Sequence, residues 1–207
     1  MFNQKNAASF LFTLSVLLAL LTGSPLGRGA EAKPDAQNDT KPAPQSDMKC
    51  LKPGMITSVG QSSDVAVVKA LLNARLKLGL EVKVMAEPSD LAQIKTLVVV
   101  LGASTKGMGA AGLNMDKELE RAKTLVSAAK EKGVRILALH VGGESRRGKT
   151  TDDLLRVVLP ESAHIVVVAS GNQDKLFNTI AAPYKVPVTE VPNLAGAGEA
   201  VKALFQE

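Results

Sequence analysis

Four segments of the chain concentrate glycine, hydroxyl-bearing and charged residues, the types that can bind an anion or move a proton. They are residues 60–64, 102–112, 140–150 and 170–174. The candidate ligand-binding residues in the first three segments are Gln61, Ser62, Ser63, Asp64, Ser104, Thr105, Lys106, His140, Glu144, Arg146 and Arg147. These residue types also form turns and cap helices, so a purely structural role accounts for part of the list.

The adjacent residues Arg146 and Arg147 are the strongest indication of a ligand. A guanidinium group is planar and can donate two parallel hydrogen bonds, which suits a carboxylate or a phosphoryl group. We therefore predict a small anionic ligand, and a solvated basic loop balanced by nearby acids is the alternative. Because exposed loop charges usually contribute under about 1 kcal/mol to stability, we expect that changing both arginines to alanine leaves the fold nearly unchanged.

Two glycine motifs match nucleotide-binding patterns without the context that those patterns need. Residues 107–112 fit G-x-G-x-x-G, but they begin several residues after the predicted strand at 96–101 ends, and that strand is not the first in the chain. Residues 143–150 fit G-x-x-x-x-G-K-[ST], but no predicted strand ends in an aspartate that would hold magnesium. Asp152 and Asp153 would also repel a phosphate at the start of the following helix. We expect neither a dinucleotide site nor a nucleotide hydrolase, and no cofactor.

His140 and Ser104 could take part in proton transfer or nucleophilic catalysis. Each follows an apolar run, and a hydrolase or transferase that uses His140 with Ser104 is one alternative function. The sequence around Ser104 lacks the G-x-S-x-G elbow, and no carboxylate is placed to complete a triad. A buried structural role is the other interpretation of His140. The catalytic residues therefore stay unassigned, and we expect no metal site because no second histidine or cysteine lies near His140.

The hydrophobic pattern alternates between strand and helix periods along the chain. Short runs rich in β-forming residues lie at 55–59, 81–85, 96–101, 135–141, 164–169 and 186–191, and helical spacing is clearest at 64–78 and 116–132. This order predicts an α/β fold, with a doubly wound and mainly parallel sheet of five or six strands and helices on both faces, Rossmann-like or flavodoxin-like. We expect the strands that end at Leu101 and Val141 to be neighbours, so that Ser104 and His140 face a common crevice.

The amino terminus has the order of a secretory signal peptide. Lys5 precedes an apolar run at 7–21, and Ala30-Glu-Ala32 fits the small-x-small cleavage rule. The run is shorter than the roughly 20 residues that span a bilayer, although retention as an anchor stays open. We expect a signal peptide at 1–32, a disordered linker at 33–49 and a single domain at 50–207, exported to the periplasm or the cell exterior without stable membrane insertion.

The composition of the chain limits the kinds of partner that we expect. Aromatic residues are 3% of the chain and the formal net charge is +5, which disfavours stacking on single strands and phosphate contacts along a duplex. We therefore expect no nucleic acid. The single cysteine, Cys50, is either a free thiol or half of an intermolecular disulfide. A module that binds a protein partner through this domain is the second alternative function.

Three loops in order resemble one family of exported bacterial proteins. The segments are residues 56–64, residues 102–112 and residues 140–148, and the likeness covers nearly all of 55–205. That family is catalogued as a domain of unknown function, number six-three-zero-five in its series. The resemblance implies a Rossmann-like module and no established activity.

Overall fold

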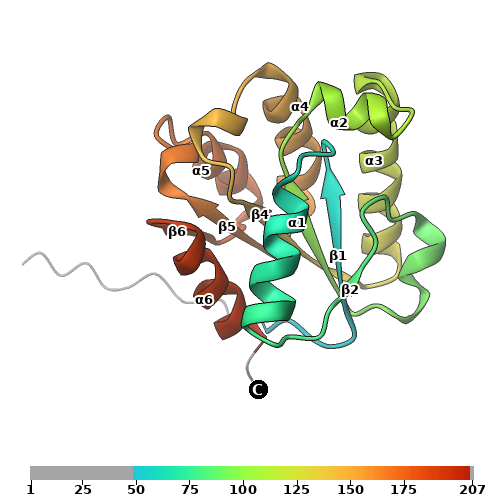
Figure 1. Ribbon diagram of the computed structural model, residues 1–207, viewed down its shortest axis with the longest axis vertical. Coiled ribbons are helices and arrows are strands. Elements are labelled where there is room, and N and C mark those ends of the chain that lie inside the picture. Colours follow the sequence, from blue (N-terminus) through green and yellow to red (C-terminus); the bar gives the residue numbers. More distant parts are fainter. Residues whose placement is uncertain (1–48, 206–207) are drawn as a thin grey trace, which may run out of the picture. The chain divides into compact units, whose positions relative to one another are not determined.

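The computed structural model describes residues 49–205 (Figure 1). The predicted signal peptide at 1–32, and the predicted linker apart from Lys49, lie outside the described residues. Within residues 49–205, none of the helices has both the length and the apolar character that crossing a membrane would require.

A parallel sheet of six strands forms the centre of the domain. The strands are β1 (Gly54–Val59), β2 (Glu81–Val82), β3 (Thr96–Leu101), β4 (Arg135–His140), β5 (His164–Val168) and β6 (Val188–Val191), in the order β2-β1-β3-β4-β5-β6. Every neighbouring pair is parallel. The predicted doubly wound fold is confirmed, and β3 and β4 are neighbours as expected.

Helices connect the strands. They are α1 (Asp64–Lys69), α2 (Thr105–Ala110), α3 (Met115–Glu131), α4 (Lys149–Val158), α5 (Leu176–Ala181) and α6 (Leu194–Leu204). A π-helical segment, η1 (Ala70–Arg75), continues α1, and short 3₁₀ turns are η2 (Pro88–Gln93), η3 (Glu144–Arg146), η4 (Leu159–Glu161), η5 (Ala169–Gly171) and η6 (Ala182–Tyr184). The helix predicted at 116–132 is thus α3, whereas the one predicted at 64–78 divides into α1 and η1.

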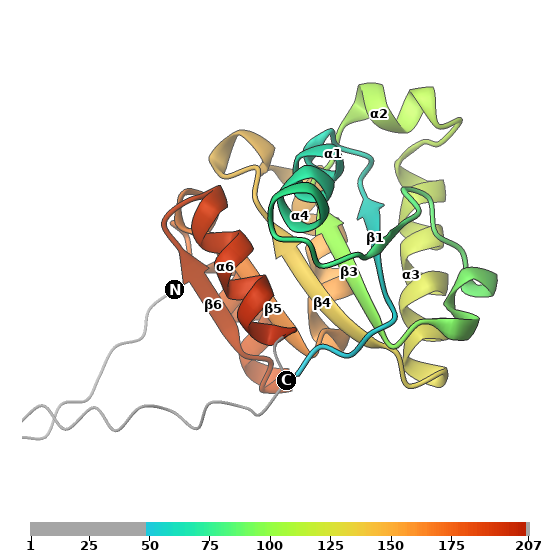
Figure 2. The same ribbon diagram turned by 60° about the horizontal axis from the view of Figure 1, so that its bottom comes forward.

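The helices lie on both faces of the sheet, with α1 and α6 on one face and α3, α4 and α5 on the other (Figures 1 and 2). Successive side chains of a strand point to opposite faces, so a strand covered on both sides is apolar throughout. All six residues of β3 are buried accordingly. The core on the side of α1 and α6 includes Ile56, Val98, Leu139 and Val166 from the strands and Val201 from α6. The core on the opposite side includes Val99 and Val167 from the strands and Leu125, Leu154 and Phe177 from α3, α4 and α5.

Cys50 is a buried free thiol at the start of the described chain. Its backbone N–H donates to the carbonyl of Leu204, which ties this segment to the end of α6. Burial raises the pKa of the thiol to about 12. Because a disulfide forms through an exposed thiolate, this environment favours the free thiol over the intermolecular bridge.

Candidate functional site

The carboxyl ends of the parallel strands meet at one edge of the sheet. Every candidate residue predicted from the sequence either follows β1, β3 or β4 or, in the case of His140, ends β4, so the connectivity brings all of them to this edge. In doubly wound sheets, ligands bind at this edge where the strand order reverses, which in this order is between β1 and β3.

The space between the ends of β1 and β3 is closed by the chain's own backbone. The N–H of Gly102 donates to the carbonyl of Val59 at 3.1 Å, and the N–H of Ser104 donates to the carbonyl of Gly60 at 2.7 Å. Gly60 has a φ of 100°, and a Cβ there would lie 2.4 Å from the carbonyl oxygen of Gly102. The loops after β1 and β3 therefore occupy the position that a ligand takes in related sheets.

A buried ion pair on α3 holds the loop after β1. Glu118 is fully buried, and its Oε1 accepts hydrogen bonds from the N–H of Gly60 at 2.7 Å and from Nε2 of Gln61 at 3.1 Å. Arg121 donates to both carboxylate oxygens of Glu118 and to the carbonyls of Ser58 and Ala86. Burial alone would raise the pKa of Glu118, but the hydrogen bonds from Arg121 and Gly60 outweigh it and hold the pKa below its ordinary value.

Gln61 is therefore a structural residue and not a free ligand-binding group. Its backbone has a left-handed φ of 56°, and Glu118 fixes its side chain. Sequence reasoning missed Glu118 and Arg121, because an acid in the first turn of a helix usually faces solvent and favours the helix dipole. Their i, i+3 spacing was the one available signal.

The predicted crevice shared by Ser104 and His140 does not form. His140 is fully buried, with Nδ1 2.9 Å from the carbonyl oxygen of Leu101 and Nε2 3.2 Å from that of Gly143. Ser104 instead caps α2, where its Oγ accepts the N–H of Gly107 at 3.0 Å. Both ring nitrogens of His140 face backbone carbonyls, so that prediction is wrong and the structural interpretation of His140 fits the geometry.

The two buried histidines make stability depend on pH. Burial lowers the pKa of His140 and of His164 below the ordinary value of 6.5. Protonation therefore favours the unfolded chain, and this stabilisation is present in full above the ordinary value and is lost as the pH falls through the folded-state pKa values. We expect denaturant unfolding to give a smaller unfolding free energy near pH 5.5 than near pH 7.5. A double variant, H140Q and H164Q, should lose most of this difference, and a wild-type unfolding free energy that is constant over the interval would contradict the assignment.

Arg147 is an internal cross-link between two loops at this edge. Its side chain is 12% exposed and makes a bidentate pair with Asp174, at 3.0 and 2.9 Å, and its Nε donates to Asp152 at 2.9 Å. The guanidinium carbon lies 5.6 Å from the centre of the Phe177 ring. The hydrogen bonds to Asp174 are the main cause that raises the pKa of Arg147 above its ordinary value. The guanidinium of Arg147 is thus engaged within the protein, and the prediction that it is an exposed loop charge is wrong.

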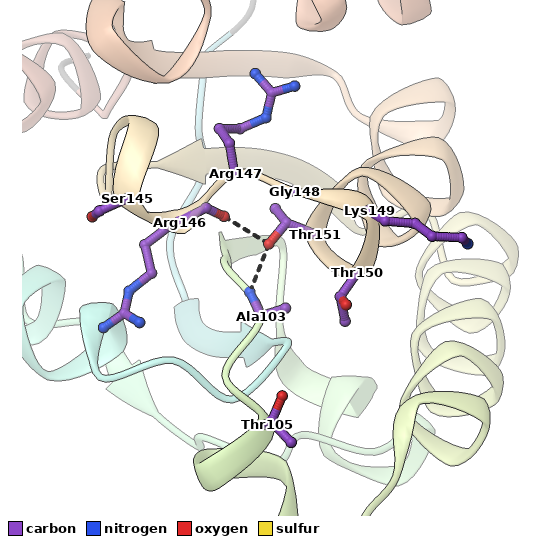
Figure 3. Close-up of a pocket in the computed structure, with 9 residues that line it drawn as sticks. All are labelled: Ala103, Thr105, Ser145, Arg146, Arg147, Gly148, Lys149, Thr150 and Thr151. Atoms are coloured by element: carbon purple, nitrogen blue, oxygen red, sulfur yellow. Dashed lines mark hydrogen bonds between the residues drawn. The ribbon is translucent and has the colours of Figure 1, made fainter.

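The G-x-x-x-x-G-K-[ST] segment does not form a phosphate-cradling loop around Lys149. Nζ of Lys149 pairs with Asp153 at 2.7 Å and the lysine side chain is 89% exposed. Figure 3 shows this side chain extending away from the pocket beside the first turn of α4. Glu144 and Lys106 are also exposed, and Glu144 borders a separate, more open hollow beside Asp152 and Asp174.

A polar pocket of about 150 Å³ lies at this edge, between the loop after β3 and the start of α4 (Figure 3). It is lined by Ala103, Thr105, Ser145, Arg146, Arg147, Gly148, Lys149, Thr150 and Thr151. Thr151 joins its walls, because its Oγ1 accepts the N–H of Ala103 at 3.0 Å and donates to the carbonyl of Arg146 at 2.7 Å. Within residues 49–205, no side chain caps the amino terminus of α4. The pocket therefore adjoins the positive end of the helix dipole.

Arg146 links this pocket to the loop after β1. Its side chain is 32% exposed; Nη2 donates to Oγ of Ser63 at 3.2 Å and Nε lies 3.5 Å from Oδ1 of Asp64. Asp64 is 9% exposed, and Oδ2 has no hydrogen-bond partner among the described residues. Ser62 is buried and accepts the N–H of Asp64 at 3.3 Å. The structure thus brings Ser62, Ser63, Asp64 and Arg146 together, and it places Thr105 and Arg146 on one pocket.

The profile of one protein family matches most of the chain. It is described as a domain of unknown function (DUF6305), and it matches residues 52–205. No curated protein matches the sequence at a significant level.

Proposed function

The chain belongs to the DUF6305 family, a domain of unknown function, and from the geometry of the site we propose that it binds a small anion at the amino terminus of α4. The observation that carries this proposal is the polar pocket beside the uncapped first turn of that helix. Helix termini with free amide groups and a positive dipole end are favourable sites for carboxylates and phosphates.

The charges around the pocket support an anionic ligand. Arg146 borders it, and its guanidinium group is partly exposed. The two acids near the start of α4 are balanced, because Asp152 pairs with Arg147 and Asp153 pairs with Lys149. The amino-terminal dipole of α4 therefore adds positive potential at the pocket, and Arg146, which pairs with Asp64 at 3.5 Å, is a partly exposed cation at its border.

The size of the pocket restricts the ligand. Drug-sized ligands occupy about 300–1,000 Å³, whereas this pocket holds about 150 Å³, the volume of roughly five liquid waters. A phosphate, an acetate or an acid with a few carbon atoms fits, and a nucleotide does not.

We expect Arg146→Ala to weaken anion binding by roughly tenfold, which corresponds to the loss of one charged hydrogen bond. The experiment is calorimetric titration at low ionic strength with acetate, glycolate and inorganic phosphate. Arg156→Ala is the matched control, because Arg156 is exposed near the other end of α4 and does not line the pocket. Equal affinities for the two variants, or no binding to the wild type, would refute the proposal.

We also propose that the protein is exported, with cleavage after Ala32. The apolar run at 7–21 and the Ala30-Glu-Ala32 ending support this. Sequencing the amino terminus of the protein recovered from the periplasm or medium should give Lys33 as the first residue. A chain that keeps Met1 in the membrane fraction would show that the segment is an anchor.

A further inference from the structure

We infer that His140 is a pH-sensitive latch on the turn at Gly143, in the loop after β4. The neutral ring holds the end of β3 alone, and the protonated ring holds the end of β3 and this turn together. The turn leads into η3, which carries Arg146 at the border of the pocket (Figure 3). This inference goes beyond anion binding and does not depend on it.

The two ring nitrogens of His140 face backbone carbonyls from different parts of the chain. Nδ1 lies 2.9 Å from the oxygen of Leu101 at the end of β3, and Nε2 lies 3.2 Å from the oxygen of Gly143. A neutral imidazole carries one N–H and can donate to one of these oxygens only, whereas an imidazolium donates to both. Because the contact with Leu101 is the shorter, the neutral ring carries its proton on Nδ1, and Nε2 faces Gly143 without one.

The packing around His140 keeps Nε2 directed at the turn. The ring is fully buried, and its centre lies 5.3 Å from that of Phe177 on α5. A Cβ at Gly171 in η5 would lie 2.8 Å from Nε2. The carbonyl of Gly143 accepts the N–H of Arg146 at 3.2 Å, which leaves its second lone pair facing Nε2. A proton on Nε2 therefore converts a contact between two acceptors into a charged hydrogen bond.

The groups around His140 set the pH range of the latch. Burial is the main cause that lowers the pKa of the ring, and the charge of Arg147 acts in the same direction. The carbonyls of Leu101 and Gly143 and the carboxylate of Asp64 on α1 act in the opposite direction. The latch therefore closes below the ordinary value of 6.5, as the pH falls through the folded-state pKa. The added hydrogen bond offsets part of the cost of burying the charge, and acid remains destabilising for the whole domain.

A pH titration of the full-length wild-type protein followed by ¹⁵N and ¹³C NMR tests the latch. At about pH 7.5 we expect the ring signals to show a protonated Nδ1 and an unprotonated Nε2. As the pH falls, Nε2 should take up a proton with a midpoint below 6.5. The carbonyl ¹³C signal of Gly143 should move with the same midpoint, because this carbonyl gains a hydrogen bond. The signal of the Leu101 carbonyl should move less, because it is hydrogen-bonded in both states.

Three results on the wild type would overturn the inference. They are a proton on Nε2 of His140 at neutral pH, a ring titration that leaves the Gly143 carbonyl signal unmoved, and unfolding of the domain before the ring titrates. These readouts need no variant, so they remain decisive if a substitution of His140 does not fold.

Two histidine variants separate the latch from the general effects of acid. His140→Asn keeps a donor near the position of Nδ1 and has none at the position of Nε2, so the carbonyl signal of Gly143 should lose its titration. His164→Gln is the matched control, because His164 is also buried but lies at the start of β5, and this variant should keep the titration. A titration of Gly143 that persists in His140→Asn, or that disappears in His164→Gln, would assign it to another group.

Discussion

Replacing Arg147 with alanine is expected to lower the free energy of unfolding by roughly 2–4 kcal/mol. The side chain is 12% exposed and bonds to Asp152, Asp174 and the carbonyl of Gly171. Its loss removes the link between the loops after β4 and β5 and leaves Asp152, in the first turn of α4, without its ion-pair partner. Urea unfolding followed by circular dichroism measures the change.

Two further substitutions serve as comparisons for this prediction. Arg147→Lys keeps the charge but cannot make the bidentate pair, so it should fall between the wild type and alanine. Arg146→Ala should cost less than Arg147→Ala, because its contacts are longer and its side chain is more exposed. If Arg147→Ala and Arg146→Ala destabilise equally, Arg147 does not cross-link the loops.

Replacing Glu118 with alanine is expected to lower the unfolding free energy by roughly 3–5 kcal/mol. The change leaves Arg121, which is 12% exposed, as a nearly buried charge without its ion-pair partner. It also removes the acceptor for the N–H of Gly60 and for the side chain of Gln61. Hydrogen exchange at the amide of Gly60 should therefore become faster as well.

Glu120→Ala is the matched control for Glu118. Glu120 lies two residues further along α3 and is exposed, so its removal should change stability by no more than about 0.5 kcal/mol. A Glu118 variant as stable as the Glu120 variant would mean that the ion pair does not hold the loop after β1.

The period of the hydrophobic pattern determined how much of the fold could be predicted. The uniformly apolar runs that became β3 and β5 required cover on both faces, and alternation with helices required a parallel sheet. The connectivity then placed every candidate loop on one edge. Helix continuity was harder, because η1 takes π-helical bonds where the sequence keeps an ordinary helical stripe.

The chemistry of single side chains could not be predicted in the same way. Arg146 and Arg147 are adjacent and identical in type, yet one borders the pocket and the other turns inward to Asp152 and Asp174. Which one turns depends on acids that lie 5 and 27 residues further along the chain. His140 was placed correctly at the carboxyl edge of the sheet, but the carbonyls that enclose its ring come from the turn of the backbone at Gly143 and from the neighbouring strand.

Amide chemical shifts locate the anion most directly. The protein labelled with ¹⁵N would be titrated with acetate and, separately, with inorganic phosphate at constant ionic strength. An anion held at the start of α4 should move the amide signals of Thr105, Thr150 and Thr151 first and saturably, because these residues line the pocket. The signal of Lys185, which is exposed and does not line this pocket, should stay in place. Shifts that spread over the exposed lysines without saturating, while the amides of Thr150 and Thr151 stay unchanged, would contradict an anion site at α4.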